Sequence, residues 1–242
     1  MEDAAVIAYK FLSAGAYGLF SRFAWPAPSN GTPGEWVHAD GELEPCLNGV
    51  HACAGATLVD WLDEELWEVE LEGDVLEAEG TLVAPAGRLV RRVEGWNGDC
   101  ARRFTDYCVD TAVALAAESL ARAGHESDAE ALAASRSRPD AEQHVLELAR
   151  RFEHEPSSPV LFLADVTRLE RGGRPDLDAG PPPPEEGGPT PSAIAANVGF
   201  VCAHIAASLA EQEAAGAYGA RFAAERQLQS DWLAGQLKLP LT

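Results

Sequence analysis

The segment 45–53, PCLNGVHAC, holds the most concentrated group of chemically capable side chains in the chain. Cys46, His51 and Cys53 place two thiols and an imidazole within eight residues, next to a turn favoured by Gly49. In an extended strand His51 and Cys53 project to the same face, because side chains alternate from one face to the other. These three residues are therefore the candidate catalytic group.

Three interpretations of this group are open. One thiol can act as a nucleophile with His51 as its base, which requires a lowered thiol pKa and a third group that orients the ring. Cys46, His51 and Cys53 can instead supply three of the four ligands of a structural zinc site, although their spacing matches no standard zinc module. In the third interpretation Gly49 turns the chain, His51 bonds a neighbour and Cys53 packs in the core. The sequence assigns no metal and no cofactor.

Tryptophans are concentrated near this group, since five of the six lie in the first hundred residues. Several indoles in a small β-rich unit can line an apolar pocket for a small molecule, and they serve equally well as its core. The candidate ligand-binding residues are Trp25, Trp36 and Trp61.

Strand patterns dominate the sequence around the candidate group. In 66–72, Trp67, Val69 and Leu71 alternate with three glutamates, which indicates a half-buried and therefore antiparallel strand. Further strands are predicted over 5–12, 19–25, 75–84 and 88–93, and a short helix between residues 55 and 66. The arginines of 88–92 are expected to lie across from the glutamates on a neighbouring strand.

After Gly98 the spacing of apolar residues becomes helical. Helices are predicted over 99–124, 127–135, 139–152, 158–169, 192–215 and 217–237. The segment 172–191, rich in Pro, Gly and acidic residues, is expected to be an exposed loop. The predicted fold class is α+β, with a mostly antiparallel β-rich domain over 1–98 followed by a helical bundle over 99–242.

The charge is strongly negative, at a formal −21. Such a surface repels nucleic acid and anionic lipid, so neither is an expected partner. The charge is explained either by a basic protein partner or by a general bias toward solubility. The start of the chain lacks the pattern of a signal peptide, and no apolar run approaches a membrane span. Five cysteines, an odd number, indicate reduced thiols and a cytoplasmic location.

Several segments together resemble a family of uncharacterised actinobacterial proteins: YKFLSAGAYGLFSRFAWP, PCLNGVHAC, WLDEELWEVELEG, LVAPAGRLVRRVEGW and AAERQLQSDWLAGQL. This resemblance implies no activity. The order of 49–51, a helix around Trp61 and a strand over 66–72 is also similar to the ADP-ribosyltransferase fold, without that family's catalytic glutamate or NAD-binding motif. That likeness is an analogy of fold only.

Two functions follow from these patterns. The first is an enzyme or small-molecule-binding protein whose site surrounds the 45–53 turn. The alternative is a non-catalytic acidic protein, an inhibitor or scaffold, that binds a basic partner.

Overall fold

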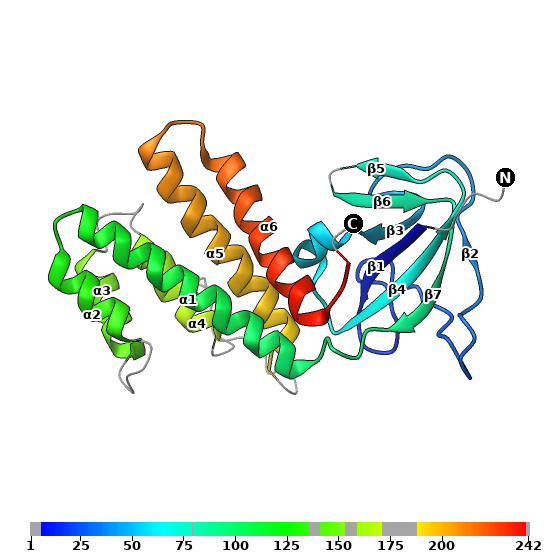
Figure 1. Cartoon of the computed structure of the whole chain (residues 1–242), viewed down its shortest axis with the longest axis horizontal. Coiled ribbons are helices and arrows are strands. Elements are labelled where there is room, and N and C mark those ends of the chain that lie inside the picture. Colours follow the sequence, from blue (N-terminus) through cyan, green and yellow to red (C-terminus); the bar gives the residue numbers. More distant parts are fainter. Residues whose placement is uncertain (1–5, 79, 136–140, 153–158, 171–187, 241–242) are drawn as a thin grey trace. The chain divides into compact units, whose positions relative to one another are not determined.

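A computed structural model describes residues 6–78, 80–135, 141–152, 159–170 and 188–240. It confirms the α+β class, with an antiparallel sheet in the N-terminal half and helices in the C-terminal half (Figure 1). Contacts divide the chain into two compact units, one of residues 1–100 with 227–242 and one of residues 101–226. The first unit thus combines the β-rich region with the end of the chain, which the sequence had grouped with the other helices.

Seven strands form one antiparallel sheet in the order β2-β7-β4-β1-β3-β6-β5. Its longest ladder joins β1 to β4 over seven residue pairs. A short 3-10 helix, Gly55–Trp61, follows β3 where the sequence predicted a helix. The strands are β1 (Val6–Leu12), β2 (Val37–His38), β3 (Val50–Cys53), β4 (Glu65–Glu72), β5 (Leu76–Ala78), β6 (Thr81–Ala84) and β7 (Ala86–Arg92).

The sheet curls on itself, and Pro85 shows why. This one residue separates β6 from β7, yet β6 pairs with β3 and β7 pairs with β4, on opposite sides of β1. A proline lacks the N–H that continues a ladder, so it suits the bend between two strands. The two halves of the sheet are therefore drawn round toward each other, as Figure 1 shows.

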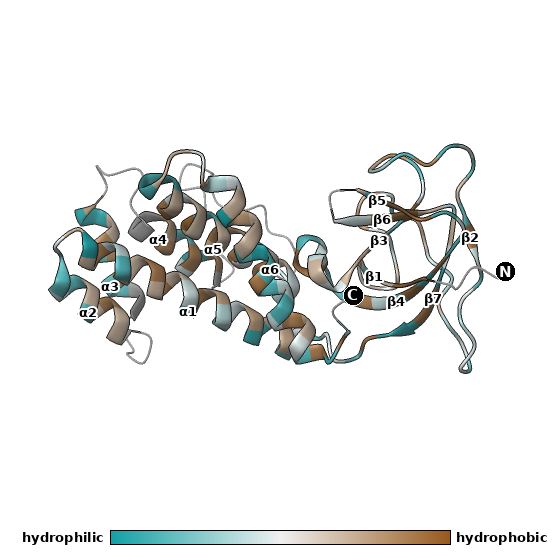
Figure 2. Ribbon diagram, turned by 45° about the horizontal axis from the view of Figure 1, so that its top comes forward, coloured by the Kyte–Doolittle hydropathy of each residue, from teal (hydrophilic) through white to brown (hydrophobic). Residues whose placement is uncertain are grey.

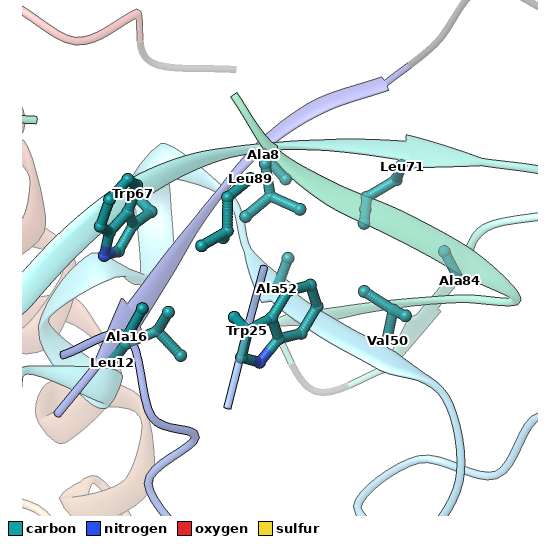
Figure 3. Close-up of a cluster of buried hydrophobic side chains, with 11 residues drawn as sticks. Ala8, Leu12, Ala16, Trp25, Val50, Ala52, Trp67, Leu71, Ala84 and Leu89 are labelled. Atoms are coloured by element: carbon teal, nitrogen blue, oxygen red, sulfur yellow. The ribbon is translucent and has the colours of Figure 1, made fainter. Parts of the chain in front are cut away.

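The inside of this curl is packed with apolar side chains (Figure 3). Val50 of β3 approaches Gly87 of β7 so closely that a Cβ at Gly87 would lie 2.7 Å from the Val50 Cγ1. The two strands are not neighbours in the sheet, so this contact crosses the interior. The cluster consists of Ala8, Leu12, Ala16, Trp25, Val50, Ala52, Trp67, Val69, Leu71, Ala84 and Leu89.

The other face of β4 carries the glutamates predicted to meet arginines, and this pairing is confirmed. Glu70 lies opposite Arg88 in register, with a 2.6 Å ion pair, and Glu68 lies opposite Arg91, with which it also pairs. Cross-strand pairs of opposite charge stabilise a sheet modestly. They fix the register of β4 and β7 while the apolar side faces the core.

Two strand predictions were wrong in detail. The segment 19–25 is an irregular loop, whose one bridge in the described structure joins Tyr17 to Ala24; Arg22 there has φ +54°, outside the strand region. The segment 75–84 is two strands, because Gly80 turns the chain at φ +78°. Apolar composition alone did not reveal either turn.

The second unit is helical. Hydrophobic and hydrophilic residues are interspersed along its helices (Figure 2). Residues 172–187 of the predicted loop at 172–191 lie outside the described residues. Pro139, the expected start of α3, also lies outside them. The helices are α1 (Gly98–Arg122), α2 (Glu126–Ser135), α3 (Ala141–Arg151), α4 (Pro159–Glu170), α5 (Pro191–Glu213) and α6 (Tyr218–Leu237), with α1 and α6 continuing into the first unit.

Helix α5 is, among the described residues, long and apolar enough to cross a membrane by length and composition. The sequence expectation that no run approaches such a length was therefore too strict. Buried core helices of soluble proteins meet the same criterion, and α5 buries residues such as Val198, Cys202 and Ile205.

The contact between β3 and β7 gives a test of the curl. Replacing Gly87 with Ala would force the new Cβ against Val50 and Leu71, so we expect a loss of about 1–3 kcal/mol in the free energy of unfolding. Gly235→Ala is the control, because nothing lies within 4 Å of its Cβ position on α6. Chemical denaturation of both variants makes the comparison, and equal stabilities would contradict the curled packing.

Candidate functional site

The first unit contains a cavity of about 420 Å³ beside β1 and β3. Two of the three predicted tryptophans, Trp25 and Trp61, line it. Trp36 does not; its ring lies under the Arg88 guanidinium, 4.5 Å from the ring centre. The three predicted catalytic residues also border the cavity: Cys46, His51 and Cys53.

The cavity lies where β1 and β3 separate. Their ladder contains one pair, Tyr9 with Cys53, whereas continuing the register would set Phe11 opposite His51. In place of that pairing, the Lys10 ammonium donates a 2.5 Å hydrogen bond to the backbone carbonyl of His51. The ammonium thus satisfies a backbone carbonyl at a position where β1 and β3 no longer pair.

Lys10 is the one charged residue of β1, and it lies among apolar neighbours. It shares a strand face with Ala8 and Leu12, both members of the core cluster, and its ammonium lies 5.1 Å from the centre of the Trp25 ring. Within the described part of the chain no carboxylate forms an ion pair with it. Desolvation by burial lowers the pKa of Lys10 to about 8.

His51 is held by backbone groups on both ring nitrogens. Its Nε2 accepts a 2.9 Å hydrogen bond from the Cys46 N–H, and its Nδ1 lies 3.0 Å from the Gly49 carbonyl, which fixes the proton on Nδ1. This neutral ring bridges the two ends of the turn, where Cys46 has φ +66°. Burial lowers the pKa of His51 and outweighs the hydrogen bond to the Gly49 carbonyl, which raises it; the charge of Lys10 lowers it further, and the neutral form is favoured.

Neither cysteine is paired with His51 as a nucleophile with its base. The Cys53 thiol is buried and donates to the Tyr9 carbonyl at 3.3 Å, and burial raises its pKa to about 12, so it stays protonated. Cys46 is exposed, and its backbone rather than its thiol contacts the imidazole. In the residues described, no group of three or more Cys, His, Asp or Glu side chains is arranged to hold a metal.

The rim of the cavity is apolar and exposed. Phe20 is 85% exposed and Leu47 76% exposed, and Phe23 lies beside Trp25 in an edge-to-face contact. All three line the cavity. Exposed apolar side chains around a cavity are typical of ligand-binding surfaces, because a bound ligand removes their apolar area from water.

Hydrogen bonds hold the Leu47 side of the rim in place. The Asn48 amide donates to the carbonyls of Asp40 and Glu42, and the backbones of Glu44 and Asn48 bond each other in both directions. Together with His51, these contacts fix the turn whose tip is Leu47. These hydrogen bonds therefore hold the part of the cavity wall that carries Cys46 and His51, two of the predicted catalytic residues.

Lys10 is the central residue that the sequence analysis missed. Of the 18 basic residues in the chain only two are lysines, Lys10 and Lys238. A lysine in the apolar run VIAYKFL, in a chain that otherwise uses arginine, was the available signal. Lysine shifts its pKa readily when buried, whereas arginine stays charged.

Comparison with known protein families, with curated proteins and with solved structures gives no match. The resemblance to the actinobacterial family and the analogy to ADP-ribosyltransferases stay predictions.

Burial of the Lys10 amine predicts that this residue destabilises the fold at neutral pH. The lowered pKa means that the unfolded chain binds more protons between about pH 8 and 10.5, so wild-type stability rises with pH in this window. We expect Lys10→Met to raise the free energy of unfolding by about 1–3 kcal/mol at pH 7. The gain should shrink toward pH 10.5. Urea unfolding at several pH values measures it, and a constant or negative difference would contradict the burial.

The two hydrogen bonds of His51 predict a structural effect. His51→Ala should lower the free energy of unfolding by about 1–2 kcal/mol, while Cys46→Ser, at an exposed thiol, should change it little. Because the folded pKa is lowered, this stabilisation is present above the ordinary value of 6.5 and is lost as pH falls through the folded value. Denaturation at pH 8 and pH 5 tests both parts; a cost that grows on acidification would refute the neutral ring.

Proposed function

We propose that the chain binds a small, largely apolar molecule in this cavity, with an acceptor oxygen of the ligand directed at Lys10. The observation that carries the proposal is an amine without a counter-charge among the described residues, on the apolar wall of a cavity of ligand size. Small-molecule sites combine such walls with a few polar groups that orient the ligand.

The walls favour an aromatic or otherwise flat apolar body. Trp25 and Trp61 border the inside, and Phe20, Phe23 and Leu47 border the entrance. Large apolar rings stack on or edge against such side chains with a gain beyond their buried area. A ligand of this kind would cover rim groups that now contact water.

The amine favours an oxygen rather than a cation on the ligand. Its ammonium has three donors, of which the structure assigns one to the His51 carbonyl. A ligand carbonyl or carboxylate can accept another in a poorly hydrated setting, where charge-assisted hydrogen bonds are strong. The chain as a whole is strongly acidic, whereas this cavity carries the positively charged ammonium of Lys10.

The cost of keeping the amine there supports a binding role. A half-buried lysine whose pKa is displaced by desolvation, in a cavity, is a candidate functional group on physical grounds. The thiols and imidazole support the same cavity by shaping its wall, with His51 contributing the carbonyl that positions Lys10. The ligand-binding hypothesis of the sequence is thus retained with a different central residue.

Isothermal titration calorimetry with 2-naphthoate tests the proposal, since this probe joins a flat apolar body to acceptor oxygens. We expect saturable binding by the wild type and a dissociation constant about tenfold or more higher for Lys10→Met, because a charge-assisted hydrogen bond is lost. Leu47→Ser should weaken binding severalfold by removing apolar contact at the rim.

Lys238→Met is the matched control, since it removes the other lysine, which is exposed and lies outside the cavity lining. It should bind 2-naphthoate as the wild type does. Absence of saturable binding, or equal affinities for the wild type and Lys10→Met, would overturn the proposed function.

A further inference from the structure

We infer that Lys10 is a carbonyl-capturing residue, which forms a reversible imine with an aldehyde or ketone held in the cavity. This inference rests on the proposed function and specifies its substrate class: an aromatic or apolar carbonyl compound. It assigns covalent chemistry to the amine that the geometry places at the wall.

The position of the Nζ supports this chemistry. One hydrogen bond to the His51 carbonyl fixes the direction of the side chain, and the Trp25 ring lies on one side of it. Lys10 is among the residues that line the cavity, whose volume of about 420 Å³ can hold a flat ligand. Holding an amine and a carbonyl in such proximity converts a bimolecular attack into an effectively unimolecular one.

The step balances with water as its only by-product. The lone pair of the neutral amine attacks the carbonyl carbon, the C=O electron pair moves to oxygen, and a proton passes from nitrogen to that oxygen, giving a carbinolamine. Loss of the hydroxyl with a second proton releases water and leaves a C=N bond. No oxidant, metal or further reactant enters, and hydrolysis by water reverses the step.

The surroundings of Lys10 keep part of the amine neutral. Among the described groups, those that titrate and face it are the Cys53 thiol and the His51 imidazole on β3; β4 presents Trp67 opposite it, and the 19–25 loop presents Trp25. With a pKa of about 8, about one tenth of the amine is neutral at pH 7, roughly 300-fold more than for an ordinary lysine. Arginine at this position would stay charged and could not react.

Trapping with 2-naphthaldehyde and sodium borohydride tests the inference on the full chain. Borohydride reduces the imine to a stable secondary amine, and peptide mass spectrometry then locates the added mass at Lys10, Lys238 or the N-terminal amine. We expect labelling of Lys10 at pH 7 at least tenfold above that of Lys238. The ratio should fall as the pH rises to 9.5, because the neutral fraction of an ordinary lysine rises roughly 300-fold in that range while that of Lys10 rises only about tenfold.

Lys10→Arg keeps the charge and removes the reactive amine. It should still bind 2-naphthoate measurably while losing the trapped adduct, and this separates chemistry from folding. Binding of 2-naphthoate by the wild type without preferential adduct formation at Lys10 would overturn the imine and leave the binding function standing. Failure of both probes would remove the binding function as well, and adduct formation abolished by excess 2-naphthoate would support the two together.

Discussion

The curled sheet encloses an amine with no opposing charge on the described residues, and the local structure is organised around that constraint. Lys10 lies between core residues on β1, where a charge is expensive unless something compensates for it. The compensation consists of the His51 carbonyl and the face of the Trp25 ring. Each compensates for the charge only in part, because neither carries a formal negative charge. The pKa of Lys10 is lowered by desolvation as a result.

Each neighbouring feature follows from this arrangement. Separation of β1 and β3 after a single pair frees the His51 carbonyl for the ammonium and opens the cavity. The His51 ring is hydrogen-bonded to the Cys46 N–H and the Gly49 carbonyl. These bonds hold the turn, and with it the backbone carbonyl of His51 that accepts from Lys10. The bend at Pro85 brings β7 near β3 and supplies the apolar interior in which the amine is desolvated. The proposed binding chemistry and the sheet topology are thus linked through the Lys10 side chain.

The sequence predicted the regular part of this structure well and the site only in part. Alternation in 66–72 and the arginines that follow it located β4, β7 and their ion pairs, because those signals are local and periodic. Residues of the 45–53 segment border the cavity. Which atoms face each other there depends on where the pairing of β1 and β3 ends, and no local sequence pattern indicates that point. Lys10 was passed over since it lies 41 residues from its acceptor. The expectations of a cytoplasmic location and of a basic partner stay predictions.

The central claim is that the amine of Lys10 is desolvated and without a counter-ion, and NMR titration tests it most directly. Protein labelled with ¹³C only at its two lysines gives two side-chain signals, assigned by comparison with Lys238→Arg. The account predicts that the Lys10 signal titrates with a pKa of about 8. A Lys10 signal that titrates at the ordinary lysine value of about 10.4 would contradict it.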